Sequence, residues 1–268
     1  GEYNTGIGYK SLCGNTTGVR NTATGFQSLH ANTTGARNAG FGVNALYYNT
    51  TGACNTAVGN SSQHSNTTAS YNTSIGACSL YANTTGAQNT GVGFCALVST
   101  TCGHCNTSLG SHALAGNTTG CCNTATGAFT LRTNTTGSCN TAFGTRALNS
   151  STTASNNTAI GLCSSYATTT AGYNTAVGMY SLQTNTTGVA SVAIGYEALK
   201  NATTGGWQTA VGTGAMYSNT TGARNVAIGV YGLKGNTTGA SNTASGYYAL
   251  LCNSTGSCNT AVGADSLK

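Results

Sequence analysis

The chain repeats a unit of seventeen residues without a gap, and this period constrains its fold more than any other feature. Residues 174–190, NTAVGMYSLQTNTTGVA, align with residues 21–37, NTATGFQSLHANTTGAR, without an insertion. Fifteen complete units run from Asn4 to Cys258, and a partial unit covers residues 259–268. A short fixed period indicates an array in which each unit contacts mainly its neighbours. We therefore expect residues 1–268 to form a single repeat array.

Two apolar columns emerge when the units are aligned with the first Asn as position 1. Position 4 is apolar in thirteen of sixteen units, and position 9 is Leu in thirteen, as at Leu12, Leu29 and Leu46. The variable positions 6, 7, 10, 11, 16 and 17 carry nearly all of the charged residues. Because burial of apolar surface drives folding, we expect positions 4 and 9 to form the core and the variable positions to face solvent.

Each unit is expected to form one coil of two short strands and two turns. Alternation from position 1 to position 4 indicates a strand, and a Gly follows it at position 5 of every unit. A second strand carries the Leu of position 9, and Asn-Thr-Thr-Gly at positions 12–15 is a turn sequence. A single coil cannot bury its apolar face, so successive coils must stack in register. The sequence thus predicts an all-β fold, a parallel β-solenoid of about sixteen coils and on the order of 75 Å long.

The composition agrees with stacking in register. The chain contains no Pro, a residue that would break a hydrogen-bonded ladder. Asn fills position 1 in fourteen of sixteen units, and Asn side chains can hydrogen-bond to their own copies along a ladder. Position 3 is always Gly, Ala or Ser. We interpret this small-residue column as a face that packs closely against another surface, most simply a second copy of the chain.

Two segments, SVAIG at 191–195 and NVAIG at 225–229, carry a resemblance to a known family. With the general pattern Asn-Thr-Ala-Val/Ile-Gly-x-x-Ala/Ser-Leu, they resemble the head repeats of trimeric autotransporter adhesins and the related repeat arrays of phage tail fibres. The resemblance covers essentially the whole chain. It implies a left-handed parallel β-roll, three chains packed about one axis, and an extracellular binding or spacer role.

The twelve cysteines gain meaning when they are placed in the repeat. Cys78 and Cys95, for example, occupy position 7 of adjacent coils. Stacked Cα atoms would be ~4.8 Å apart, within the range that disulfides prefer. Bridges can form between coils or across the turn before the last unit, so the candidate disulfide residues are Cys78, Cys95, Cys105, Cys122, Cys252 and Cys258. The alternative is that these residues remain thiols, and the sequence leaves both interpretations open.

Position 12 begins an Asn-x-Ser/Thr glycosylation acceptor in eleven units, and two displaced acceptors partly fill the gaps. One interpretation is a ridge of sugars along one edge of the coils. The alternative is a turn that requires Asn, Thr and Gly, with hydroxyls hydrogen-bonded from coil to coil. The candidate N-glycosylation residues are Asn15, Asn32, Asn49, Asn66, Asn83, Asn117, Asn134, Asn149, Asn185, Asn201, Asn219, Asn236 and Asn253.

The sequence offers little for catalysis. The only acidic residues, Glu2, Glu197 and Asp265, are too far apart in the array to form a carboxylate pair. The motif CGHC at residues 102–105 copies a redox motif but replaces an ordinary turn, whereas that chemistry needs a helix N-terminus. No two of the four histidines share a column on adjacent coils: His30, His64, His104 and His112. We therefore expect no enzymatic activity, no metal site and no cofactor.

Charge and hydropathy give further expectations about partners. The net charge of +6 comes from scattered residues, which does not favour a nucleic-acid partner. No apolar run approaches the ~18 residues that span a bilayer, so we expect no membrane insertion. Acceptor sites and candidate disulfides together favour an extracellular setting.

We therefore expect a structural segment of an extracellular fibre, with or without glycans, whose partners are copies of itself. The chain starts at repeat position 15 and stops at position 10, with no atypical capping unit. This pattern predicts either a longer parent protein or head-to-tail stacking of copies. Two alternatives stay open: an adhesin head or phage tail-fibre shaft that binds a host receptor, and an ice-binding β-solenoid that uses its Thr columns.

Overall fold

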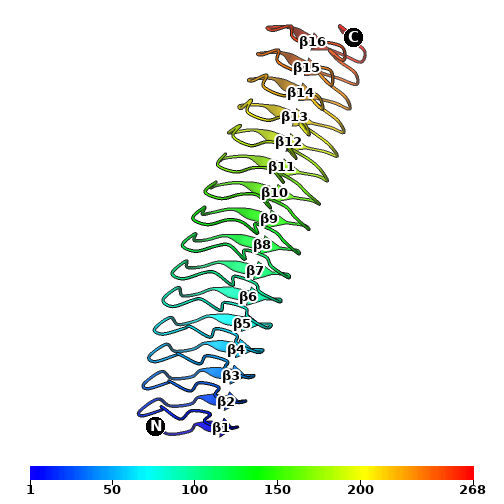
Figure 1. Ribbon diagram of the computed structural model, residues 1–268. Helices are drawn as coiled ribbons and strands as arrows, with labels where there is room; N and C mark the ends of the chain where they lie inside the picture. Colours follow the sequence, from blue (N-terminus) through cyan, green and yellow to red (C-terminus); the bar gives the residue numbers. More distant parts are fainter. The chain divides into compact units, whose positions relative to one another are not determined.

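The computed structural model describes all 268 residues and contains strands but no helix. It is a parallel β-solenoid with one coil for each seventeen-residue unit, as the sequence predicts (Figure 1). The chain forms two compact units, Gly1–Gly137 and Ser138–Lys268. Each unit holds eight strands in chain order.

Every coil contributes one strand of three residues, from position 2 to position 4. The strands of the first unit are β1 (Thr5–Ile7), β2 (Thr22–Thr24), β3 (Ala39–Phe41), β4 (Thr56–Val58), β5 (Thr73–Ile75), β6 (Thr90–Val92), β7 (Thr107–Leu109) and β8 (Thr124–Thr126). Those of the second unit are β9 (Thr141–Phe143), β10 (Thr158–Ile160), β11 (Thr175–Val177), β12 (Val192–Ile194), β13 (Thr209–Val211), β14 (Val226–Ile228), β15 (Thr243–Ser245) and β16 (Thr260–Val262). Within each unit, neighbouring strands pair in parallel at a register of seventeen residues, as Thr56 opposite Thr73 illustrates. The predicted stacking is confirmed.

The second predicted strand, around position 9, does not form. Positions 7 and 9 adopt left-handed backbone angles, as at Gln27 with φ 54° and Leu29 with φ 51°. Residues in this region turn the chain, so the segment is a run of turns. Its backbone is still satisfied by the neighbouring coils: the N–H of Gln27 donates to the carbonyl of Tyr9 at 2.8 Å, and that of Leu29 donates to the carbonyl of Ala45 at 2.9 Å. These bonds offset a conformational cost of about 1–2 kcal/mol for each left-handed residue other than Gly.

The invariant Gly of position 5 is required by both its angle and its surroundings. Gly25 has φ 136°, which residues with a side chain rarely adopt. A Cβ atom at this position would collide with the carbonyl oxygen of Gly42 in the next coil. The chain therefore has no alternative to Gly at this corner.

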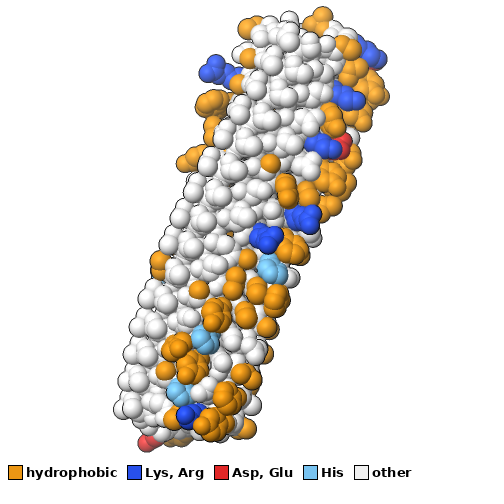
Figure 2. Space-filling view, in the orientation of Figure 1, with side chains coloured by type: hydrophobic (Ala, Val, Ile, Leu, Met, Phe, Trp, Pro, Cys, Tyr) orange, Lys and Arg blue, Asp and Glu red, His pale blue; other side chains and the backbone are white.

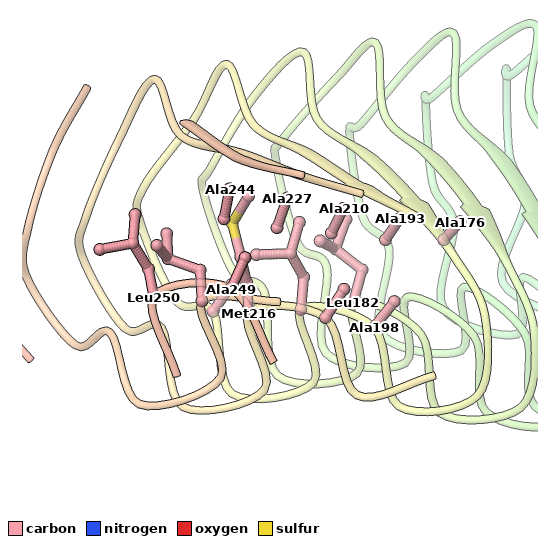
Figure 3. Packing of buried hydrophobic residues seen from close by; sticks show 14 of the residues in the cluster. Ala176, Leu182, Ala193, Ala198, Ala210, Met216, Ala227, Ala244, Ala249 and Leu250 are labelled. Carbon is pink, nitrogen blue, oxygen red and sulfur yellow. The ribbon is translucent and has the colours of Figure 1, made fainter. Parts of the chain in front are cut away.

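The interior is built from positions 9 and 3. Leu29 and Leu46 have no exposed surface, and they cluster with buried alanines of which Ala23 and Ala57 occupy position 3. Leu12 packs against the same cluster, so successive leucines share one core. Figure 3 shows the equivalent arrangement in the second unit, where Leu182 and Leu250 extend across the coil toward the alanine column.

The predictions for positions 3 and 4 were wrong. Side chains alternate along a strand, so positions 3 and 4 cannot both face inward. The narrow coil is filled by a Leu from one side, and close packing leaves room only for Gly, Ala or Ser from the other. The small-residue column therefore packs against the leucines of its own chain, and the apolar side chains of position 4 point outward, as Phe41 does with 40% of its surface exposed.

The Asn column at position 1 forms the expected ladder. The backbone N–H of Asn72 donates to Oδ1 of Asn55 at 3.0 Å. The Nδ2 of Asn55 donates to the carbonyl of Ala69 at 2.8 Å, in the turn near the end of its own coil. Each Asn thus connects one coil to the next and the strand to the turn.

Candidate functional surfaces

The outer face of each sheet carries two parallel columns, from positions 2 and 4. Position 2 is Thr in thirteen of sixteen units, and neither column contains a charged residue. The aliphatic side chains of position 4 are partly exposed, as at Val58 (37%), Ile75 (42%) and Leu109 (39%). Strand alternation places positions 2 and 4 on one face of the strand, but it does not indicate whether that face is inside or outside.

A second surface, here called the aromatic edge, follows positions 6, 7 and 10. Figure 2 shows hydrophobic side chains with basic and His side chains gathered along one edge in each unit. In the first unit the rings of His30, Tyr47, His64 and Tyr81 form a continuous stack with centroid distances of 4.9, 5.4 and 4.9 Å. Tyr9 is 61% exposed on the same edge. Rings repeated at the coil spacing therefore stack on one another along this edge.

In the second unit the aromatic edge holds the shorter of the two ion pairs. The Lys200 Nζ lies 2.6 Å from a carboxylate oxygen of Glu197. The same ammonium lies 5.2 Å from the ring centre of Tyr180 and 5.6 Å from that of Tyr217. The hydrogen bond to Glu197 raises the pKa of Lys200. This cluster joins three coils through one cation.

The asparagines of position 12 lie inside the coil. Nine of the eleven predicted acceptors have at most 1% of their surface exposed: Asn32, Asn49, Asn66, Asn83, Asn117, Asn134, Asn185, Asn219 and Asn236. The Nδ2 of Asn49 donates both to Oδ1 of Asn32 at 2.7 Å and to the carbonyl of Gly52 at 3.0 Å. A glycan on such an amide would have to occupy the filled interior. We therefore expect these nine asparagines to carry no glycan in the folded chain.

The four remaining acceptors, Asn15, Asn149, Asn201 and Asn253, are half-buried. Asn15 and Asn253 still donate to the turn carbonyls of Gly18 and Gly256 at 3.0 Å. Asn149 and Asn201 occupy variable positions 10 and 11 on the outside of the coil. Glycosylation stays a prediction for these two residues.

The Thr residues of position 13 serve the stack. The hydroxyl of Thr33 donates to the carbonyl of Thr50 in the next coil at 3.0 Å, and Thr50 does the same to Thr67 at 3.0 Å. The turn Asn-Thr-Thr-Gly therefore supplies a buried amide at nine of its eleven Asn positions and a hydroxyl bonded to the next coil. This arrangement supports the interpretation of the acceptor pattern as turn chemistry.

None of the twelve cysteines forms a disulfide in the structure. Cys78 and Cys95 do meet: burial raises the pKa of the Cys95 thiol, and the adjacent Cys78 thiol raises it further. Stacked Cβ atoms at the strand spacing are about 4.8 Å apart, whereas a disulfide needs about 3.5–4.5 Å. A bridge here requires the two coils to approach each other.

The other candidate disulfide residues, Cys105, Cys122, Cys252 and Cys258, are exposed. The Cys105 thiol donates to Oε1 of Gln88 at 3.3 Å. In the CGHC segment, His104 Nδ1 accepts from the N–H of Ala87 at 3.0 Å, and no helix begins there. The histidine side chain therefore accepts a hydrogen bond from the backbone of the preceding coil. Ser70 plays the same role, since its hydroxyl accepts from the N–H of Ala53 at 3.0 Å.

The acidic and histidine residues lie on separate coils of the chain. No three or more His, Cys, Asp or Glu side chains gather as metal ligands, and no pocket opens in either unit. The structure contains no helix that could cross a bilayer. Glu197 and Asp265 each pair with the Lys three residues later, and Glu2 lies at the exposed start of the chain.

Comparison with known proteins identifies no relative. No protein-family model matches the chain, and no curated protein matches its sequence. The protein is described by its fold, a parallel β-solenoid with a seventeen-residue repeat.

Proposed function

We propose that this chain is a structural segment of an extracellular fibre assembled from copies of itself. The observation that carries the proposal is that the repeated residues are used for stacking. Leu of position 9 and Ala of position 3 fill the interior, and Asn of positions 1 and 12 and Thr of position 13 bond one coil to the next. Such a stack gives stiffness at any length, since each coil depends only on its neighbours.

The equivalence of the coils supports a proposal of end-to-end stacking. The N–H of position 2 donates to the position 1 carbonyl of the following coil, as Thr243 does to Asn259 at 2.8 Å. In the last coil the N–H of Thr260 has no acceptor within the chain. Any equivalent coil stacked on β16 carries the carbonyl that this group needs, and an unpaired strand edge invites such addition.

Side-by-side packing of copies is best supported at the aromatic edge. Its most exposed rings in the first unit are Tyr9 (61%) and Phe94 (54%), and in the second unit Tyr247 (49%). Aromatic side chains bury large areas at protein interfaces. We propose lateral contacts through these rings, in a trimer as the resemblance to autotransporter heads implies.

The test of end-to-end assembly uses two variants of one residue. Thr260→Pro removes the N–H that a following coil would accept and breaks no hydrogen bond within the chain, whereas Thr260→Val keeps that N–H. Sedimentation and electron microscopy should show concentration-dependent filaments for the native chain and for Thr260→Val, and shorter ones for Thr260→Pro. A native chain that stays a monodisperse monomer at high concentration would contradict the proposal.

A binding role is the second candidate. The resemblance to trimeric autotransporter heads and phage tail-fibre repeats supports a shaft or head that contacts a host receptor. Exposed Tyr and Trp residues at position 17, such as Tyr71 (65%), Tyr173 (70%) and Trp207 (60%), are suitable contacts. Adhesion of labelled chain to host cells, lost on replacing these three residues with Ser, would favour this role over a purely structural one.

A further inference from the structure

We infer that the outer sheet face of the first unit binds ice, a function beyond that of a fibre segment. The face in question, here called the threonine face, consists of five consecutive coils. Its position 2 residues are Thr56, Thr73, Thr90, Thr107 and Thr124, and its position 4 residues are Val58, Ile75, Val92, Leu109 and Thr126.

The hydroxyls of the threonine face are available to an external partner. At position 13 each Thr hydroxyl bonds to the next coil, as Thr84 does to the carbonyl of Thr101 at 3.1 Å. The five hydroxyls of position 2 make no hydrogen bond to any other part of the chain. They lie on the outward side of their strands, opposite the buried alanine and serine residues of position 3. The structure of the chain itself gives these threonines no polar partner.

The hydroxyls are held in a regular row. The strands pair in register from β4 to β8, with Thr56, Thr73 and Thr90 opposite one another in turn. Thr107 and Thr124 continue the row. A β-branched side chain has restricted freedom at χ1, so each hydroxyl is presented with little loss of entropy on binding.

The spacing of the row matches that of ordered water. Paired strands repeat at about 4.7–4.9 Å. In a tetrahedral water network with O–H···O distances of about 2.75 Å, second-neighbour oxygens are about 4.5 Å apart. The mismatch is about 0.3 Å per coil, and over the four intervals of the row it reaches about 1 Å, well below one hydrogen-bond length. Five successive hydroxyls can therefore replace five oxygens of one ice row.

The chemical character of the face also favours ice over a charged partner. Ice carries no net charge, and neither column of the threonine face contains a charged residue. Lys and Arg of the first unit lie at positions 7, 10 and 17, away from the strand. Beside each hydroxyl row, the aliphatic groups of position 4 remain 37–42% exposed at Val58, Ile75 and Leu109. Adsorption to a crystal surface would release the liquid water next to these groups, which is favourable because apolar surface is then removed from liquid water.

The experiment compares two lysine substitutions in one region of the first unit. Thr90→Lys places a long charged side chain in the middle of the threonine face. Thr85→Lys places the same side chain on an exposed turn of the preceding coil, outside the face. Thermal hysteresis and adsorption of fluorescently labelled chain to a single ice crystal are measured for both. The native chain and Thr85→Lys should show both activities, and Thr90→Lys should lose most of them.

A second variant keeps the test decisive if Thr90→Lys folds poorly. Thr90→Val preserves shape and strand preference but removes one hydroxyl from the row, and circular dichroism should show native folding. Partial loss of thermal hysteresis in Thr90→Val supports the inference. A folded native chain without thermal hysteresis overturns it, as does equal activity of Thr85→Lys and Thr90→Lys.

Two other occupants are distinguished by the same proteins. If sedimentation shows that Thr90→Lys dissociates an assembly that Thr85→Lys leaves intact, the threonine face is a contact between copies and the inference is wrong. Retention of the native chain on crystalline cellulose or chitin without adsorption to ice also overturns it. Filament formation tested through Thr260 is independent of these outcomes, so the fibre proposal can fail or succeed separately.

Discussion

The backbone N–H of Asn38 donates to the side-chain Oδ1 of Asn21, its equivalent one coil earlier, at 2.9 Å, and both side chains are buried. The Nδ2 of Asn21 in turn donates to the carbonyl of Gly35 at 2.8 Å. A single buried amide therefore satisfies a strand N–H of the next coil and a turn carbonyl of its own. Because this relationship recurs along each unit, the stability of the stack should depend strongly on the Asn ladder.

The first prediction concerns that ladder. Asn55→Ala removes the acceptor of the Asn72 N–H, which is then buried without a partner. We expect a loss of about 1–3 kcal/mol in the free energy of unfolding, measured by urea denaturation. Asn60→Ala, at an exposed position of the same coil, is the matched control and should change stability by no more than about 0.5 kcal/mol. Equal losses in the two variants would contradict a structural role for the buried Asn.

The second prediction tests which apolar column is inside. Leu97 at position 9 has no exposed surface, whereas Leu109 at position 4 is 39% exposed. Leu97→Ala should cost about 2–5 kcal/mol, because it opens a cavity. Leu109→Ala should cost about 1 kcal/mol, because much of its side chain already contacts water. Thermal denaturation of both variants measures the difference, and a reversed order would restore position 4 to the core.

The third prediction concerns left-handed backbone. Ser61 at position 7 has φ 53°, and its counterpart in the second unit, Gly214, has φ 59°. Ser61→Gly relieves a conformational cost of about 1–2 kcal/mol, which exceeds or cancels the entropic cost of Gly of about 0.5–1 kcal/mol. We therefore expect an unchanged or slightly raised free energy of unfolding. Ser65→Gly, in the same coil but outside the left-handed region, should lower the free energy of unfolding. Urea denaturation should therefore give a lower midpoint for Ser65→Gly than for Ser61→Gly.

The fourth prediction concerns pH. Burial lowers the pKa of the His64 imidazole below its usual value of 6.5. The folded chain thus binds a proton at His64 less readily than the unfolded chain does. The contribution of this residue to stability is full above pH 6.5 and decreases as the pH falls below it. The melting temperature should decrease as the pH is lowered from about 7.5 to about 5. The variant His64→Tyr, which extends the Tyr47–Tyr81 stack, should show a smaller decrease. An identical pH dependence in this variant would exclude His64 as its source.

The fifth prediction concerns glycans. When the chain is secreted from a eukaryotic host, peptide mapping of the folded fraction should find no glycan on Asn66 or Asn83, because both amides are buried and hydrogen-bonded. Any glycan on folded protein should map to Asn149 or Asn201. Chains modified at position 12 should appear in an unfolded or degraded fraction. A folded, compact chain with sugar on Asn66 would show that the interior can open without loss of the fold.

The period, the absence of gaps and the Leu column were sufficient to predict the parallel β-solenoid from the sequence. A seventeen-residue repeat without insertion can bury its leucines only by stacking, so Leu12, Leu29 and Leu46 had to share one core. The Asn ladder and the solvent-facing charges followed from the same argument. These predictions used only the repeat pattern and required no knowledge of individual side-chain contacts.

Only the tertiary structure decided which side of the strand faces inward and which asparagines are accessible. Positions 3 and 4 are adjacent and alternate, so a pattern of small and apolar residues fits either orientation until the width of the coil is known. The coil is just wide enough for one Leu, which turns Ala23 inward and Phe41 outward. Asn32 likewise matches the motif of a glycosylation acceptor, but its side chain is buried inside the coil. The threonine face could be identified only from the structure. The orientation of the strand determines which Thr hydroxyls point outward and are not used to bond one coil to the next.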